Sequence, residues 1–176
     1  MNTLITILLI VAGIIALLFI IALFMKRKHY VKCEININAS PQKVFDYLKL
    51  IKNQDEFNEH AKAGPDRKRE FKGTDGTVGF IYSWSGNKEA GVGEKEIINI
   101  VEGKKIETEI RFVKPMTATA SIIMETESLS ENQTKVYWSN AGTLKYPVNI
   151  MIPMMEKMLP KEMDSSLSTL KSILEK

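Results

Sequence analysis

The sequence is poor in the residues that build disulfide frameworks and metal sites. It has one cysteine and two histidines among 176 residues. One cysteine excludes an intramolecular disulfide, and this set of residues is too small for a structural zinc site. The composition therefore predicts no metal and no other cofactor. The length suits one ordinary domain with an appendage.

Charge is absent from the N-terminal segment. Residues 4–25 carry no charged side chain, and as a helix they would extend about 33 Å, enough to cross a hydrocarbon core of about 30 Å. A cleaved signal peptide has a charged start, a shorter apolar core and a small-residue cleavage site, and this segment shows none of these features. We therefore interpret residues 1–25 as a transmembrane anchor, in preference to a signal peptide or a buried core helix.

A short basic segment, residues 26–29 (KRKH), follows the apolar run. Because positive charge stays on the cytoplasmic side, it predicts a single-pass membrane protein with its N-terminus outside and residues 30–176 in the cytoplasm. Removing Lys26, Arg27 and Lys28 from the 24 basic residues leaves 21, equal to the number of acidic residues. The remaining domain is thus neutral, which argues against a nucleic-acid partner.

Period-two alternation of apolar and polar residues recurs after the basic segment, and turn residues separate the runs. Two short helices are expected at about residues 41–50, after Ser40-Pro41, and at 53–59. Residues 155–174 follow helical spacing, with an interruption at Pro160. Turns are expected around residues 63–65, 73–76, 86–87, 102–104 and 130–133. The expected strands are 31–37, 67–71, 78–85, 92–101, 106–112, 117–127 and 136–140.

This order of elements defines an α+β fold. Short connections imply antiparallel pairing, and the sheet must bury its apolar face against another element. The C-terminal helix is the only element that is large enough. We therefore expect a helix-grip architecture, a curved antiparallel sheet of about seven strands around a long C-terminal helix, preceded by one transmembrane helix.

Several segments resemble a known family. They are residues 38–48 (NASPQKVFDYL), 73–79 (GTDGTVG), 82–87 (YSWSGN) and 135–138 (KVYW). They look like the polyketide cyclase/dehydrase and lipid-transport family of the START-like (SRPBCC, Bet v 1-like) superfamily. The resemblance covers essentially all of residues 30–176. It implies a START-like domain with a cavity between the sheet and the long helix, which in this superfamily usually holds a hydrophobic or amphipathic ligand.

The resemblance also indicates which side chains line this cavity. Two interpretations remain open for each one, a pocket wall or simple filling of the core. For the methionines, gap-filling is the plainer interpretation. The expected wall residues are Tyr82, Trp84, Ile98, Ile110, Phe112, Met124, Trp138, Asn140, Met154, Met155 and Met158.

Candidate catalytic groups are few. Glu94 and Glu96 alternate with Lys95, so they lie either on a wet face of the sheet or inside the cavity, where they would form a general acid/base pair. Cys33 falls on the apolar face of the first strand and is expected to be an inert buried thiol. His29 and His60 have no evident partner.

Three hypotheses about function follow. The leading one is a membrane-anchored cytoplasmic domain that binds a hydrophobic small molecule or lipid, with residues 4–25 contacting the membrane. The second is a cyclase- or dehydratase-like enzyme that uses Glu94 and Glu96. The third is a protein-interaction module in which the cavity is incidental. We favour a protein without enzymatic activity.

Overall fold

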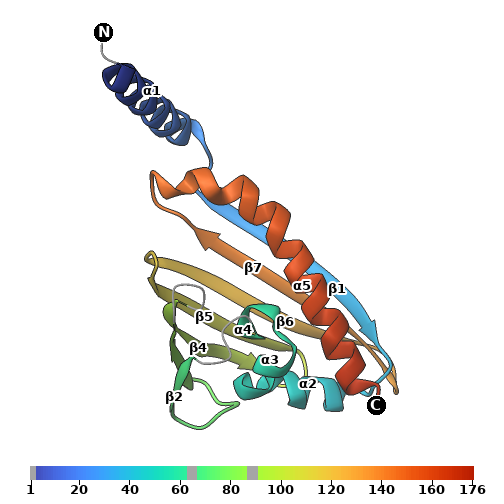
Figure 1. The fold of residues 1–176 in the computed structure, drawn as a ribbon. Coiled ribbons are helices and arrows are strands. Elements are labelled where there is room, and N and C mark those ends of the chain that lie inside the picture. Colours follow the sequence, from blue (N-terminus) through green and yellow to red (C-terminus); the bar gives the residue numbers. More distant parts are fainter. Residues whose placement is uncertain (1–2, 63–66, 87–90) are drawn as a thin grey trace.

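A computed structural model describes residues 3–62, 67–86 and 91–176. One helix stands apart from a sheet that is covered on one face by helices (Figure 1). The elements in chain order are α1 (Thr3–Phe24), β1 (Lys28–Ile37), α2 (Pro41–Lys49), α3 (Ile51–Phe57), α4 (Glu59–Lys62), β2 (Lys68–Lys72), β3 (Ile81–Ser85), β4 (Val92–Val101), β5 (Lys105–Lys114), β6 (Ala118–Ser130), β7 (Gln133–Thr143), the 3-10 helix η1 (Val148–Met151) and α5 (Ile152–Leu174).

The elements follow the sequence patterns closely. Ser40 caps α2 by accepting a hydrogen bond from the Lys43 amide at 3.4 Å, and Pro41 occupies the first turn, as expected. Pro160 was expected to kink the C-terminal helix or restart it, and α5 does not restart there but continues through this residue. The expected turns at 63–65 and at Asn87 lie outside the described residues.

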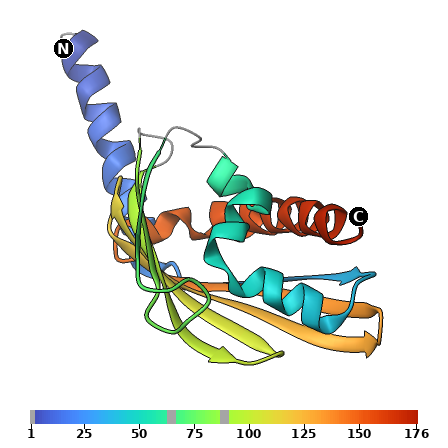
Figure 2. The same cartoon turned by 90° about the horizontal axis from the view of Figure 1, so that it is seen from below.

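The seven strands form one antiparallel sheet in the order β1-β7-β6-β5-β4-β3-β2. β1 and β2 therefore lie at opposite edges although they follow each other among the strands, and α2, α3 and α4 make the connection between them. α5 lies over the concave face of the curved sheet together with α2–α4 (Figure 2). The helix-grip fold expected from the sequence is confirmed.

The start of the domain differs from the expectation. β1 begins at Lys28 instead of after the basic segment, and His29 is buried, with 5% of its surface exposed. His29 belongs to the same concave face as Val31 and Cys33, so the period-two pattern extends further toward the N-terminus than expected. The domain thus starts within residues 26–29.

α1 has the length and composition of a helix that crosses a membrane, properties that an N-terminal signal sequence shares. Its apolar side chains are exposed except for Ala22, which is 1% exposed. At this point the amide of Asn149 donates to the carbonyl oxygens of Ala22 (2.7 Å) and Met25 (3.1 Å). The Leu144 amide donates to the Arg27 carbonyl at 2.8 Å. α1 is thus joined directly to the end of the domain where β7 stops and α5 begins.

Candidate functional site

A cavity of about 190 Å³ lies between the sheet and the N-terminal half of α5. Strands β4 to β7 form its floor, α5 forms its roof, and His29 of β1 closes one side. Most wall groups are apolar, and a few are polar. The lining residues are His29, Asn58, Lys95, Ile110, Phe112, Ala118, Thr119, Ala120, Ile122, Trp138, Asn140, Leu144, Met155, Leu159, Glu162, Met163 and Ser166.

Part of the expected wall is found in this cavity, namely Ile110, Phe112, Trp138, Asn140 and Met155. Tyr82 and Trp84 instead line an adjacent inner pocket of about 50 Å³. Asn58, Lys95 and Ile110 border both spaces. Gly93 leaves room for the Trp84 ring, since a Cβ at position 93 would approach Trp84 Cζ2 to 2.6 Å.

The remaining expected wall residues lie elsewhere. Met154 and Met158 are about half exposed, because they fall on the side of α5 next to the cavity-facing stripe. Met124 is buried in the packed core and does not reach the cavity. Ile98 is 43% exposed because it follows the inward-facing Ile97 in the alternation of β4, at the register shift between Ile97 and Asn99.

Of the two positions left open for Glu94 and Glu96, the structure shows the wet face of the sheet. In β4 the odd-numbered residues Gly93, Lys95 and Ile97 face the concave side, so the two glutamates face the convex side. There the Arg111 guanidinium contacts the carboxylates of Glu94 at 2.6 Å and Glu96 at 2.5 Å. A third contact joins Arg111 to Glu109 at 2.6 Å, and the three carboxylates raise the pKa of Arg111. The two carboxylates therefore do not line the cavity under α5 as an acid/base pair.

Lys95, which lies between the two glutamates in the sequence, faces the concave side of the sheet. It is 6% exposed, and its ammonium donates to Oε1 of Gln54. Gln54 is itself buried, and its amide nitrogen donates to the Leu48 carbonyl at 3.2 Å, which orients the amide oxygen toward Lys95. Desolvation lowers the pKa of Lys95 to about 8, and the more distant charge of Asp55 partly opposes this effect.

A second polar group of the wall is the pair formed by His29 and Asn140. His29 Nε2 lies 3.1 Å from Asn140 Oδ1 across the β1–β7 pair. Gly142 makes room for the ring, since a Cβ there would approach His29 Cε1 to 2.5 Å. The period-two pattern shared with Cys33 was the sequence signal for His29. Sequence reasoning missed it because the residue was assigned to the membrane flank.

The inner pocket contains an ion cluster around Asp55. Its carboxylate accepts hydrogen bonds from Arg67 Nη2 at 2.8 Å and from Tyr82 Oη at 3.0 Å, and Arg69 Nε lies 3.0 Å away. Only 3% of the Arg67 side chain is exposed. Asp55 thus already compensates two arginine charges close to Lys95.

Cys33 is buried, as expected. Its Sγ donates to the Pro160 carbonyl at 3.7 Å, and burial, together with the neighbouring Asp164, raises its pKa to about 12. A thiol with this pKa stays protonated at neutral pH and is a poor nucleophile. Within the described ranges, no group of His, Cys, Asp and Glu side chains could hold a metal ion.

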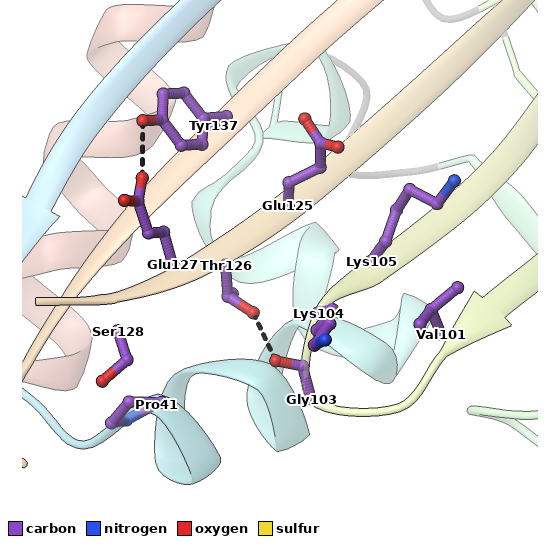
Figure 3. A pocket seen from close by; sticks show the side chains of 10 residues that line it. All are labelled: Pro41, Val101, Gly103, Lys104, Lys105, Glu125, Thr126, Glu127, Ser128 and Tyr137. Carbon is purple, nitrogen blue, oxygen red and sulfur yellow. Dashed lines mark hydrogen bonds between the residues drawn. The ribbon is translucent and has the colours of Figure 1, made fainter.

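A larger hollow of about 680 Å³ lies at the other end of the sheet (Figure 3). It is an open surface groove lined by charged and polar side chains. Tyr137 donates to Glu127 at 2.8 Å and Thr126 to the Gly103 carbonyl at 3.1 Å, so these polar groups already have partners. Its size therefore reflects open surface, and the less open cavity under α5 is the better candidate site.

Comparison with known proteins supports this fold assignment. No family model and no curated protein sequence matches the chain. Among solved structures, truncated norcoclaurine synthase from Thalictrum flavum has a TM-score of 0.64 at 10% identity. The match covers 83% of this chain and 92% of the synthase chain. Ara h 8.0201 (TM-score 0.57, 14% identity) and CV1439 from Chromobacterium violaceum (0.59, 12%) each cover 84% of this chain and 97% of their own. The chain thus has the Bet v 1-like helix-grip fold of these structures, which is the fold that the sequence resemblance implied.

Proposed function

We propose that this protein is a membrane-anchored binding protein for a small hydrophobic molecule, which it holds between the sheet and α5. The observation that carries the proposal is the 190 Å³ cavity, partly open to solvent, with a mainly apolar wall and a few polar groups. A structure of Thalictrum flavum norcoclaurine synthase in complex with dopamine and hydroxybenzaldehyde has a TM-score of 0.60 to this chain at 13% identity, with 88% and 90% of the chains covered. It is an example of this fold holding small aromatic molecules.

The cavity volume limits the size of the ligand. An apolar cavity of about 150 Å³ takes up benzene, so a cavity of 190 Å³ suits a ligand of about ten non-hydrogen atoms. A phospholipid with two acyl chains is several times larger. We therefore narrow the expected ligand from lipids in general to a small apolar or amphipathic molecule.

The cavity wall contains polar atoms with which a ligand could form hydrogen bonds. In the part of the chain that the structure describes, Trp138 Nε1 and His29 Nδ1 are buried without a hydrogen-bond partner. A buried donor or acceptor without a partner costs about 1–3 kcal/mol. A ligand with a suitably placed oxygen or nitrogen would offset part of this cost. These atoms favour an amphipathic ligand over a pure hydrocarbon.

Membrane anchoring is supported by α1 and by its attachment to the domain. The exposed apolar side chains of α1 would contact acyl chains. Near its C-terminal end Phe19 packs edge-on against Tyr146, with ring centroids 6.0 Å apart, and tyrosines favour the membrane–water interface. We place the N-terminus outside and the domain in the cytoplasm, because Lys26, Arg27 and Lys28 follow α1 directly.

The cavity lies at the anchored end of the domain. His29 and Leu144 belong to its wall, and Leu144 also bonds to Arg27 at the base of α1. A molecule dissolved in the bilayer would thus have a short path to the cavity. This position favours a membrane-derived ligand.

A cavity-filling variant tests ligand binding. Ala120 is 8% exposed and lines the cavity, so Ala120→Phe should occupy much of its volume. We expect native mass spectrometry of the full chain in nanodiscs to show a small bound molecule on the wild type and at least a tenfold loss in Ala120→Phe. Ala141→Phe, on the opposite face of neighbouring β7, is the matched control and should retain the molecule. An unliganded wild type after exposure to a total membrane extract would contradict the proposal.

Orientation is tested separately by labelling a single introduced cysteine. Ser130→Cys lies at the end of β6, remote from α1, while Cys33 is buried and should not react. We expect a membrane-impermeant maleimide to label Ser130→Cys only after cells are permeabilised. Labelling in intact cells would place the domain outside, and release of the protein in soluble form would identify α1 as a cleaved signal sequence.

A further inference from the structure

Lys95 is a buried cation placed at the inner end of the cavity. It lies in the middle of β4, on the concave face, and borders both the cavity and the inner pocket. Lysine is among the residues that are almost never fully buried unless they are paired. The hydrogen-bond acceptor of its ammonium is the neutral amide oxygen of Gln54. The position therefore calls for an explanation beyond folding.

The surroundings of Lys95 carry an excess of positive charge. Within the described residues no carboxylate lies within ion-pair distance of its ammonium. Asp55, the carboxylate with the main electrostatic influence on Lys95, already contacts Arg67 and Arg69. Three cations, of which Lys95 and Arg67 are buried, thus share the one carboxylate of Asp55. Two buried cations with so little negative charge beside them favour the binding of an anion.

Negative charge is also present in the cavity lining. Glu162 of α5 lines the cavity and is exposed to solvent, while Ile110, Phe112 and Trp138 form an apolar part of the wall. A ligand with one anionic end would therefore place that end at Lys95 and its apolar body along these side chains. The carboxylate of Glu162 would repel an anionic end placed beside it.

We propose that the cavity ligand is a small monocarboxylic acid, whose carboxylate pairs with Lys95 and whose apolar body of about seven to eight carbon atoms fills the 190 Å³ space. This inference rests on the proposed binding function and adds the chemical class of the ligand. The carboxylate supplies the charge partner that the described protein groups do not provide. The ligand acid and its uncharged analogues should therefore bind very differently.

The experiment compares an acid with the corresponding alcohol. The probes are 3-phenylpropanoate and 3-phenylpropan-1-ol, which share the same apolar body, and titration calorimetry is performed on the full chain in zwitterionic nanodiscs, with empty nanodiscs as the blank. At pH 6.5 we expect the wild type to bind the acid at least tenfold more tightly than the alcohol. Lys95→Met should lose this preference and still bind the alcohol, since methionine keeps most of the apolar stem.

The control is Lys32→Met, which removes a lysine from the exposed face of β1 and should keep the preference for the acid. The preference should also weaken above pH 8, as Lys95 loses its proton. The other charged groups that face Lys95 or the cavity are Arg67, Arg69, Asp55 and Glu162. Tyr82, whose pKa is raised, does not ionise in this range.

The outcomes separate the two proposals. Equal binding of acid and alcohol by the wild type, or an acid preference that survives in Lys95→Met, would overturn the role of Lys95 and leave the binding function intact. Absence of binding of both probes to the wild type, with no bound molecule in the mass spectrum, would overturn both.

Discussion

The two ends of the space under α5 are filled in different ways. Toward the C-terminus of α5, the buried residues Met163, Leu167, Leu170 and Leu174 pack into one continuous core with the first strand and α2. Toward its N-terminus, Met155 and Leu159 face a cavity. The same helix therefore contributes packing at one end and leaves room at the other. We infer that the packed end supplies most of the stability, so that the hollow end is free to bind.

The largest expected effect is the loss of packing at the filled end. Leu170 is fully buried, and Leu170→Ala should lower the free energy of unfolding by about 3 kcal/mol. Met155→Ala at the hollow end should cost less than about 1 kcal/mol, since its side chain already borders empty space. Urea unfolding of the full chain in detergent, followed by tryptophan fluorescence, measures both. Equal losses would remove the distinction between the two ends.

The buried lysine predicts a dependence of stability on pH at the hollow end. Its pKa is 10.5 ordinarily and about 8 in the folded protein, so between these values the unfolded chain binds more protons. Stability should therefore rise with pH across this window, by up to about 3 kcal/mol for the unliganded wild type relative to Lys95→Met. Below pH 8 the full cost of burying the charge is present, and there Lys95→Met should be the more stable protein. A constant difference between the two proteins from pH 7 to 10 would contradict this prediction.

A smaller effect is expected at the junction between α1 and the domain. Asn149 is fully buried and donates to two carbonyl oxygens at the end of α1, so Asn149→Ala leaves both without this donor. We expect a local cost of about 1–2 kcal/mol, which corresponds to roughly tenfold faster tryptic cleavage at residues 26–28 in nanodiscs. Gln133→Ala at the far end should leave the cleavage rate unchanged. Cleavage at the wild-type rate in Asn149→Ala would mean that the junction is held by other contacts.

The smallest effect is expected on the convex face. About a third of the Arg111 side chain is exposed, and ion pairs in contact with water contribute little. Arg111→Met should lower stability by less than about 1 kcal/mol, measured by the same urea titration in low salt. Part of this loss, caused by repulsion among Glu94, Glu96 and Glu109, should disappear in 0.5 M salt. A loss of stability as large as that of Leu170→Ala would show that the ion pairs on the convex face contribute substantially to the free energy of unfolding.

The sequence predicted the fold well because hairpins and an amphipathic helix leave local signals. Period-two patterns located the strands, and the spacing from Met155 to Leu174 located α5 within three residues of its observed start. β4 shows where such signals fail. The sequence around Glu94, Lys95 and Glu96 alternates charge with charge, so hydrophobicity does not distinguish its two faces. The register shift after Ile97 then interrupts the alternation, and Ile98 was assigned to the wrong face of the sheet.

Most of the polar residues of the cavity wall, including Lys95 and His29, were missed for a related reason. A lysine in a strand is ordinarily assigned to solvent, and its burial depends on Gln54 and on a cavity built by distant segments. His29 was assigned to the membrane flank because it follows three cations. The aromatic and aliphatic wall residues Ile110, Phe112 and Trp138 were predictable, since their own strands define an apolar face.

The short connection between α1 and β1 has a consequence for how the domain meets its ligands. β1 begins at Lys28, shortly after α1 ends at Phe24, and hydrogen bonds fasten the junction. A domain attached in this way moves together with α1 as one body. With α1 in a bilayer, it therefore diffuses in the plane of the membrane. Solutes of the bilayer then reach it by two-dimensional diffusion and always meet the same end. The C-terminus lies at the opposite end of the domain (Figure 1).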